Sequence, residues 1–185
     1  MEFLVELWIP IVVSAVFVFI VSSVIHMTLP IHKTDVKKMA NESDVLESLR
    51  QYNVEPGEYM FPCAKSMKDL ETPEMKAKLN QGPVGWLTVI PSGGFGMGKS
   101  LVLWFLHSLV IGLFVAYAGW YGLGSQADYL KVFRVTGAAA FLGYAVGHMH
   151  SSIWKGSSWI NTGKFMFDGL IYSLVTAGTF GWLWP

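Results

Sequence analysis

Residues 7–31 read LWIPIVVSAVFVFIVSSVIHMTLPI, an apolar stretch without a single Asp, Glu, Lys or Arg. About 20 consecutive apolar residues are enough for a helix to cross the hydrocarbon core of a bilayer. Three more charge-free runs follow, over residues 100–127, 135–154 and 169–185. Because lipid offers no hydrogen-bond partners to the backbone, we expect each run to form a helix rather than a strand.

Charged residues are scarce and unevenly distributed. They make up 14% of the chain, against about 25% in an ordinary soluble domain, and the formal net charge is zero. Of the 26 charged residues, 17 lie between Ile31 and Val84. This composition excludes a soluble enzyme, a nucleic-acid-binding protein and a disordered tail. We therefore expect an integral membrane protein whose immediate partner is the lipid bilayer.

The four runs predict an all-α membrane protein, a four-transmembrane-helix bundle with a small α+β cytoplasmic cap between the first two helices. The first helix is expected in residues 1–29, the cap in residues 30–98, and the other helices within residues 99–185, at about 100–120, 129–153 and 161–182.

The expected cap contains short local signals for structure. An amphipathic helix is predicted from Val45 to Arg50, after Asn41. A second helix is predicted after Thr72-Pro73, since Thr suits the N-cap and Pro the first helical position. The apolar residues 59–61 and 86–90 are typical of extended structure.

The distribution of Lys and Arg predicts the orientation. If residues 31–99 and the turn at 151–164 lie on the same side of the membrane, that side holds 11 of the 13 basic residues. Only Lys131 and Arg134 lie on the other. Because basic residues favour the cytoplasmic side, we expect both termini outside and residues 31–99, including Cys63, in the cytoplasm.

Residues 93–100 read GGFGMGKS and match the phosphate-binding pattern G-x-x-x-x-G-K-[ST] through Gly93, Gly98, Lys99 and Ser100. A phosphate-binding loop precedes a helix that packs on a parallel sheet of several strands. Here the following helix is apolar throughout, and no apolar run ends in the Asp that would help to bind magnesium. We interpret the match as chance and expect no nucleotide site.

Ionisable residues recur within the predicted helices, where they are costly and commonly functional. His26, His107 and His148 fall in the first three helices and Asp168 in the fourth. Imidazole suits zinc, copper and iron, and a carboxylate is compatible with zinc. These four residues are therefore the predicted metal ligands, and His107 with His148 is the pair that could ligate a haem.

The fourth predicted helix carries a polar stripe. Lys164, Asp168, Tyr172 and Thr176 recur at intervals of four, which places them on one face. We expect Asp168 to face the interior, with Lys164 and Tyr172 as its nearest local partners and a histidine from a neighbouring helix as its possible tertiary partner. Two interpretations remain open. The sequence favours hydrogen bonding that only fixes the packing, with no cofactor, and the alternative is a site for a metal, a haem or a proton path.

Three functions are compatible with these patterns. The sequence favours a protein without catalytic activity, which serves as an accessory or assembly subunit of a larger membrane complex or as a homo-oligomeric membrane component. The first alternative is a metal- or haem-binding protein that handles electrons or protons. The second is a small transporter, which would need an oligomer to form a path.

Overall fold

The chain is mostly helical and divides into two compact units. The computed structural model describes residues 2–93 and 96–185. The first unit, here called the helical unit, comprises Met1–Val36 and Gly96–Pro185, and the second, here called the insert, comprises Lys37–Phe95. The predicted helical class is confirmed, with a two-stranded sheet as the one sheet in the described residues.

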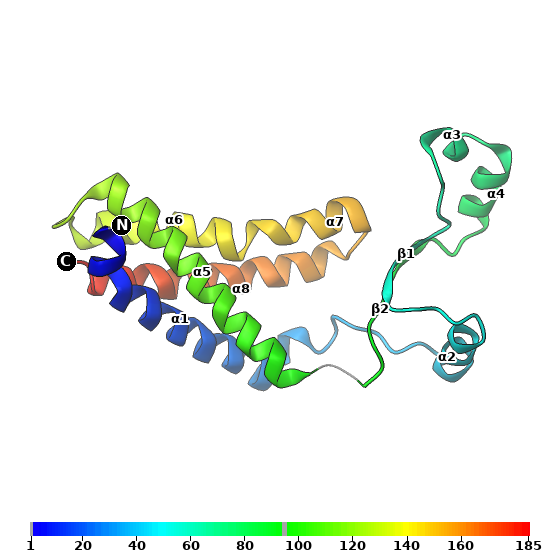
Figure 1. The fold of residues 1–185 in the computed structure, drawn as a ribbon, viewed down its shortest axis with the longest axis horizontal. Helices are drawn as coiled ribbons and strands as arrows, with labels where there is room; N and C mark the ends of the chain where they lie inside the picture. Colours follow the sequence, from blue (N-terminus) through cyan, green and yellow to red (C-terminus); the bar gives the residue numbers. More distant parts are fainter. Residues whose placement is uncertain (1, 94–95) are drawn as a thin grey trace. The chain divides into compact units, whose positions relative to one another are not determined.

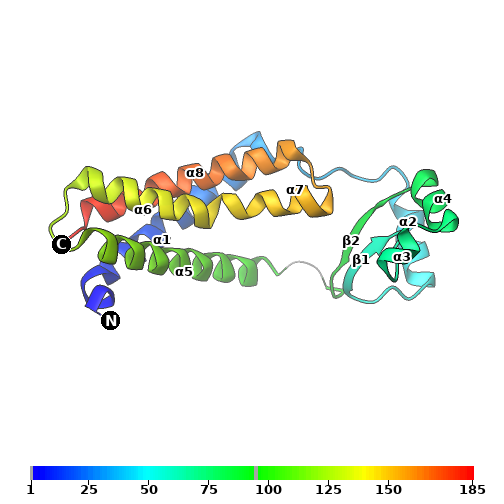
Figure 2. The ribbon, with the colours of Figure 1, turned by 90° about the horizontal axis from the view of Figure 1, so that it is seen from above.

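The helical unit is built on four long helices. They are α1 (Glu2–Thr28), α5 (Met97–Leu123), α6 (Tyr129–Tyr144) and α8 (Trp159–Trp182). Helices α1 and α6 each pack against both α5 and α8 (Figures 1 and 2). Three short elements complete the unit: η1 (Pro30–His32), η2 (Val146–His148) and α7 (Met149–Lys155).

In the part of the chain that the structure describes, two helices, α1 and α5, are long and apolar enough to cross a membrane. The four spans expected from the sequence are therefore not confirmed. The third expected helix, residues 129–153, is interrupted after Tyr144 and continues as η2 and α7. Helix α8 has the length, but its polar stripe makes it less apolar than α1 and α5.

Helices α6 and α8 approach each other closely at Gly169. A methyl group added to Gly169 would lie 2.8 Å from Cβ and 2.9 Å from Cα of Ala145, the residue that follows α6. Only glycine fits such a contact, because the backbones themselves nearly touch. This contact places Asp168, the preceding residue, deep in the unit.

The long helices bury a stripe on one side and expose apolar side chains on the other. In α1 the buried residues recur at intervals of three and four, from Phe3 and Leu7 to Ser22 and Ile25. The opposite side of α1 is also apolar and includes Val12, Ile20 and Val24, all exposed. Helix α5 likewise exposes large apolar residues, and Phe114 is 67% exposed.

The polar stripe of α8 faces the interior, as expected, since Asp168, Tyr172, Thr176 and Thr179 are buried. The hydroxyls of Thr176 and Thr179 donate to backbone carbonyl groups of α8 itself. Thr176 Oγ1, for example, lies 2.9 Å from the backbone carbonyl oxygen of Tyr172. Hydrogen bonds between helices include the one from Trp104 Nε1 to Ser22 Oγ, at 2.8 Å. The threonines are thus satisfied locally and leave Asp168 as the unusual member of the stripe.

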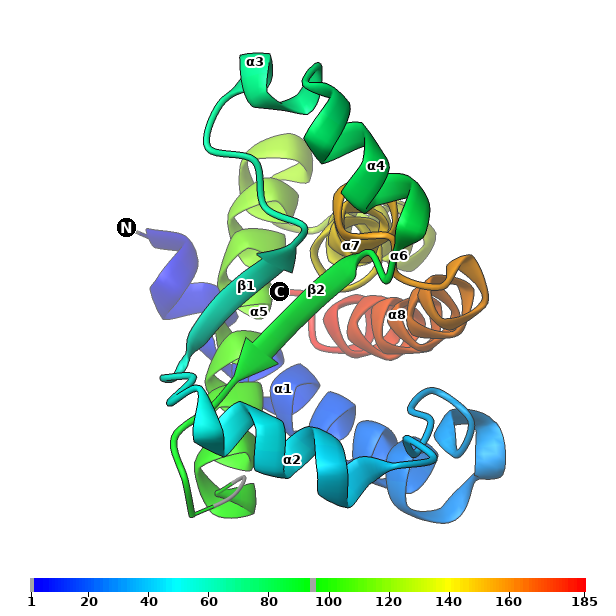
Figure 3. The same cartoon turned by 90° about the vertical axis from the view of Figure 1, so that its right-hand side faces the viewer.

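The insert consists of a two-stranded sheet and three short helices, α2 (Glu42–Gln51), α3 (Met67–Leu70) and α4 (Pro73–Gln81). Strands β1 (Gly57–Phe61) and β2 (Gly85–Val89) pair antiparallel, with Gly57 opposite Val89 (Figure 3). Helices α3 and α4 form the connection between the strands. The predicted cap at Thr72 is confirmed, because its Oγ1 accepts a hydrogen bond from the Met75 amide.

Candidate metal centre

The end of α1 determines where His32 lies relative to His26. A residue before proline is pushed towards extended backbone, and Leu29, which precedes Pro30, has φ −87° and ψ 143°. The helix therefore ends at Thr28, and Pro30 starts the short turn η1 in a new direction. As a result, the ring of His32 lies beside that of His26, with 4.4 Å between the ring centroids.

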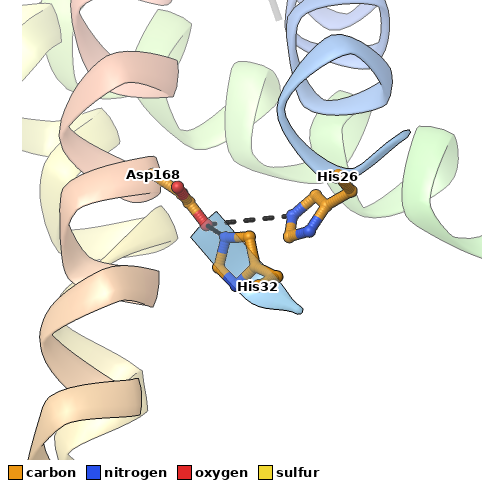
Figure 4. Close-up of side chains that lie close together, drawn as sticks. All are labelled: His26, His32 and Asp168. Atoms are coloured by element: carbon orange, nitrogen blue, oxygen red, sulfur yellow. Dashed lines mark ion pairs between the residues drawn. The ribbon is translucent and has the colours of Figure 1, made fainter. Parts of the chain in front are cut away.

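Three side chains from three elements meet at this point: His26 from α1, His32 from η1 and Asp168 from α8 (Figure 4). Asp168 Oδ2 lies 2.9 Å from His32 Nε2 and 3.8 Å from His26 Nε2. The side chain of Asp168 is only 2% exposed, that of His32 is 12% exposed and that of His26 is 42% exposed. The cluster is therefore buried on the Asp168 side and open on the His26 side.

The buried polar atoms of this cluster lack hydrogen bonds. Among the described residues, Asp168 Oδ1, Asp168 Oδ2 and His32 Nε2 are buried without a hydrogen-bond partner. His32 Nε2 lies 2.9 Å from Asp168 Oδ2, within ion-pair distance, but no hydrogen bond joins the two atoms. A buried carboxylate without donors is costly, so the arrangement favours a cation between these groups.

The spacing of the atoms fits ligands of one ion. Two ligand atoms that each lie about 2.1 Å from a metal are about 3 Å apart at a right angle and about 3.4 Å apart at the tetrahedral angle. The distance between His32 Nε2 and Asp168 Oδ2 matches the first value. His26 Nε2 is farther away, at 3.8 Å from Asp168 Oδ2, and it also lies 3.4 Å from the Tyr172 hydroxyl.

Asp35 contacts the Nδ1 side of the His32 ring and is also hydrogen-bonded to a side chain of α8. Its Oδ2 lies 2.6 Å from His32 Nδ1, and its Oδ1 lies 2.6 Å from Lys164 Nζ. Burial by itself raises the pKa of the Asp35 carboxyl, but the hydrogen bonds from Lys164 and His32 outweigh burial and hold the pKa below its usual value. Asp35 is thus an ionised acceptor, and His32 donates to it through Nδ1.

The structure brings together two of the four predicted ligands, His26 and Asp168. His107 lies elsewhere, with its ring 5.5 Å from that of Trp104. His148 stacks on Phe165 at 5.2 Å, beside a cavity of about 240 Å³ that is lined mainly by polar side chains. In the described residues, the group able to hold a metal consists of His26, His32 and Asp168.

The predicted pairing of Lys164 with Asp168 is wrong, whereas the expected histidine from a neighbouring helix, His26, does lie beside Asp168. The ammonium group of Lys164 lies 2.6 Å from Asp35 Oδ1 and 3.0 Å from Thr34 Oγ1, and Asp168 receives no hydrogen bond from it. Sequence reasoning missed His32 and Asp35 because both follow the apolar run. The available signal was Pro30, which turns the chain back at the end of a helix that already carries His26.

The phosphate-binding pattern lies partly outside the described residues, at positions 94 and 95. Lys99 and Ser100 belong to the first turn of α5, and the strand before the pattern, β2, is one of two antiparallel strands. This differs from the parallel sheet that a phosphate-binding loop accompanies.

No known family model matches this chain, and neither a curated protein sequence nor a solved structure is significantly similar to it.

Proposed function

We propose that this chain is an integral membrane protein whose helical unit binds one divalent transition-metal ion through His26, His32 and Asp168. The main support for a metal site is the buried carboxylate of Asp168, which faces two imidazoles and has no hydrogen-bond partner. Without a cation, the Asp168 carboxylate stays buried with no hydrogen-bond donor, which is costly.

The membrane location is supported by the exposed apolar surface of α1 and α5. Only 33% of the apolar window of α1 and 28% of that of α5 is buried. The core helix of a soluble protein would bury most of its surface, and a large exposed apolar surface is rare in water. In a bilayer the same side chains face lipid at no cost.

In this proposal, α8 and the interrupted segment α6–η2–α7 complete a four-helix bundle with four spans. A broken helix is tolerated at membrane depth where protein covers the break, and Gly169 packs on α6 at that point. The 11-to-2 distribution of basic residues supports a cytoplasmic insert and external termini.

The ligand set favours particular metals and a particular kind of site. Two imidazoles and a carboxylate suit zinc or iron(II), and the same combination occurs in non-haem iron enzymes. Three protein ligands leave at least one position for water or another small molecule, which distinguishes such a site from a closed structural one. The chemistry available is polarisation of a bound oxygen by zinc or electron transfer by iron.

Metal analysis of the full chain, purified from native membranes in mild detergent, tests the proposal. We expect about one zinc or iron ion per chain in the wild type and little in Asp168→Asn and His32→Ala. His107→Ala and His148→Ala are matched controls that should keep the metal, because neither residue belongs to the group able to hold an ion. Circular dichroism and gel filtration verify that each variant folds.

Two results would contradict the proposal. One is a wild-type protein that takes up no stoichiometric ion even after incubation with Zn²⁺ or Fe²⁺. The non-catalytic accessory or assembly role favoured by the sequence would then be preferred. The other is an equal loss of metal in the two control variants, which would place the metal at a different site.

A further inference from the structure

One imidazole in the helical unit connects two carboxylates. His32 Nδ1 lies 2.6 Å from Asp35 Oδ2, and His32 Nε2 lies 2.9 Å from Asp168 Oδ2. Asp35 satisfies its acceptors with His32 and Lys164, whereas Asp168 has no donors. The two carboxylates therefore differ in role: one is already saturated, and the other is available to a cation.

We infer that Asp35 is a positioning residue for the metal centre, an inference that rests on the proposed function. By accepting the Nδ1 proton of His32, Asp35 selects the tautomer in which Nε2 carries the lone pair. Only that nitrogen is near Asp168. Carboxylates in this position behind a ligating histidine fix its orientation and raise its basicity, and their loss typically weakens metal binding by about 10–100-fold.

Asp35 can perform this role because two side chains of α8 donate hydrogen bonds to it. Lys164 Nζ donates to its carboxylate at 2.6 Å, and Asn161 Nδ2 donates to its backbone oxygen at 3.0 Å. Asn161, Lys164 and Asp168 are spaced three and four residues apart, which places them on one face of α8. The helix that supplies one metal ligand therefore also holds the residue that orients another.

The chemistry of Asp35 makes the substitution Asp35→Asn informative. The Lys164 ammonium is a donor only, and the Nδ1–H of His32 is also a donor, so each needs an acceptor oxygen. Aspartate offers two oxygens, whereas asparagine offers one oxygen and an NH₂ group that repels one of the two donors. Glutamate keeps both oxygens and should restore part of the effect.

Titration of the metal-stripped full chain with Co²⁺, followed by its ligand-field absorption and by competition with Zn²⁺, measures the affinity. We expect a dissociation constant about 10–100-fold higher and a changed absorption spectrum in Asp35→Asn, with partial rescue in Asp35→Glu. Lys164→Met should weaken binding in the same direction. Asp128→Asn, which breaks the exposed pair with Lys131, is the matched control and should bind as the wild type does.

Nitrogen NMR of ¹⁵N-histidine-labelled, metal-free protein measures the tautomer directly. We expect His32 to carry its proton on Nδ1 in the wild type and to lose this preference in Asp35→Asn. Because this measurement needs no metal, it separates the inference from the proposed function. A change in the tautomer also distinguishes positioning from a merely structural role.

The outcomes are distinct. A wild type that binds no Co²⁺ or Zn²⁺ contradicts the proposed function and, with it, the role of Asp35 at a metal. If the wild type binds and Asp35→Asn has the same affinity, spectrum and tautomer, the positioning role is wrong and the metal site stands. If Asp35→Asn does not fold, Lys164→Met decides: unchanged affinity and tautomer overturn the inference, and weaker binding supports it.

Discussion

The helical unit and the insert are stabilised in different ways. Each long helix of the helical unit buries a stripe of side chains, and the core extends from Phe3 in α1 to Phe180 in α8. In the insert, none of the residues 37–93 is buried. Its structure depends on local signals, such as the cap at Thr72 and the pairing of two strands. A two-stranded sheet and short helices are marginal alone, so the two units should respond very differently to mutation.

The candidate metal centre lies within the helical unit. His26 and Asp168 lie on long helices, whereas His32 and Asp35 lie in the short segment that leads into the insert. Hydrogen bonds from Asn161 and Lys164 hold this segment to α8. The insert therefore starts directly after residues that the helical unit fixes in place.

The largest expected effect concerns the proposed cytoplasmic location of the insert. Cys63, the one cysteine of the chain, is exposed in the insert, so burial does not protect its thiol. We expect a membrane-impermeant maleimide to leave Cys63 unmodified in intact cells and to modify it once the membrane is opened. Because basic residues favour the cytoplasm, the effect should be nearly all-or-none.

A cysteine on the opposite side provides the control for this labelling. Ser125→Cys, combined with Cys63→Ser, places a thiol in the connection between α5 and α6 and should be labelled in intact cells. Rapid modification of Cys63 in intact cells would place the insert outside and reverse the proposed orientation.

The second effect compares the same substitution in both units. Phe180 is 0% exposed in the core of the helical unit, whereas Phe61 is 39% exposed on β1. We expect Phe180→Ala to lower the free energy of unfolding by about 3–5 kcal/mol, because it leaves a cavity. Phe61→Ala should cost about 1 kcal/mol or less, since its ring is already partly exposed. Unfolding of the purified chain in mixed micelles measures both, and equal losses would contradict the contrast between the units.

The third effect concerns the close contact inside the helical unit. Gly169→Ala should destabilise it by about 1–3 kcal/mol, because the new methyl group would overlap Ala145. Gly163→Ala, on the same helix, is the matched control: nothing lies within 4 Å of the added methyl group, and alanine favours the helix by about 1 kcal/mol. Thermal unfolding in detergent compares the two. A Gly169→Ala variant as stable as Gly163→Ala would mean that α6 and α8 are farther apart than the structure shows.

The sequence predicted the features that depend on neighbouring residues. The apolar runs that form α1 and α5 follow from charge and hydropathy alone, and the start of α4 follows from Thr72-Pro73. The inward direction of the α8 stripe follows from its four-residue spacing and from the cost of a carboxylate that faces lipid. The apolar runs and the N-cap of α4 are local properties, so neighbouring residues alone specify them.

The tertiary structure decided the partners of the ionisable residues and the continuity of the third helix. Lys164 pairs with Asp35, 129 positions earlier in the chain, and not with Asp168, one turn later on the same helix. His32 joins His26 and Asp168 because the turn at Pro30 folds back onto α8. Helix α6 ends at Tyr144, and Gly169 of α8 packs against the next residue, Ala145. Such contacts depend on how distant helices pack, and that packing is set by the shapes of whole helix faces rather than by any short stretch of sequence.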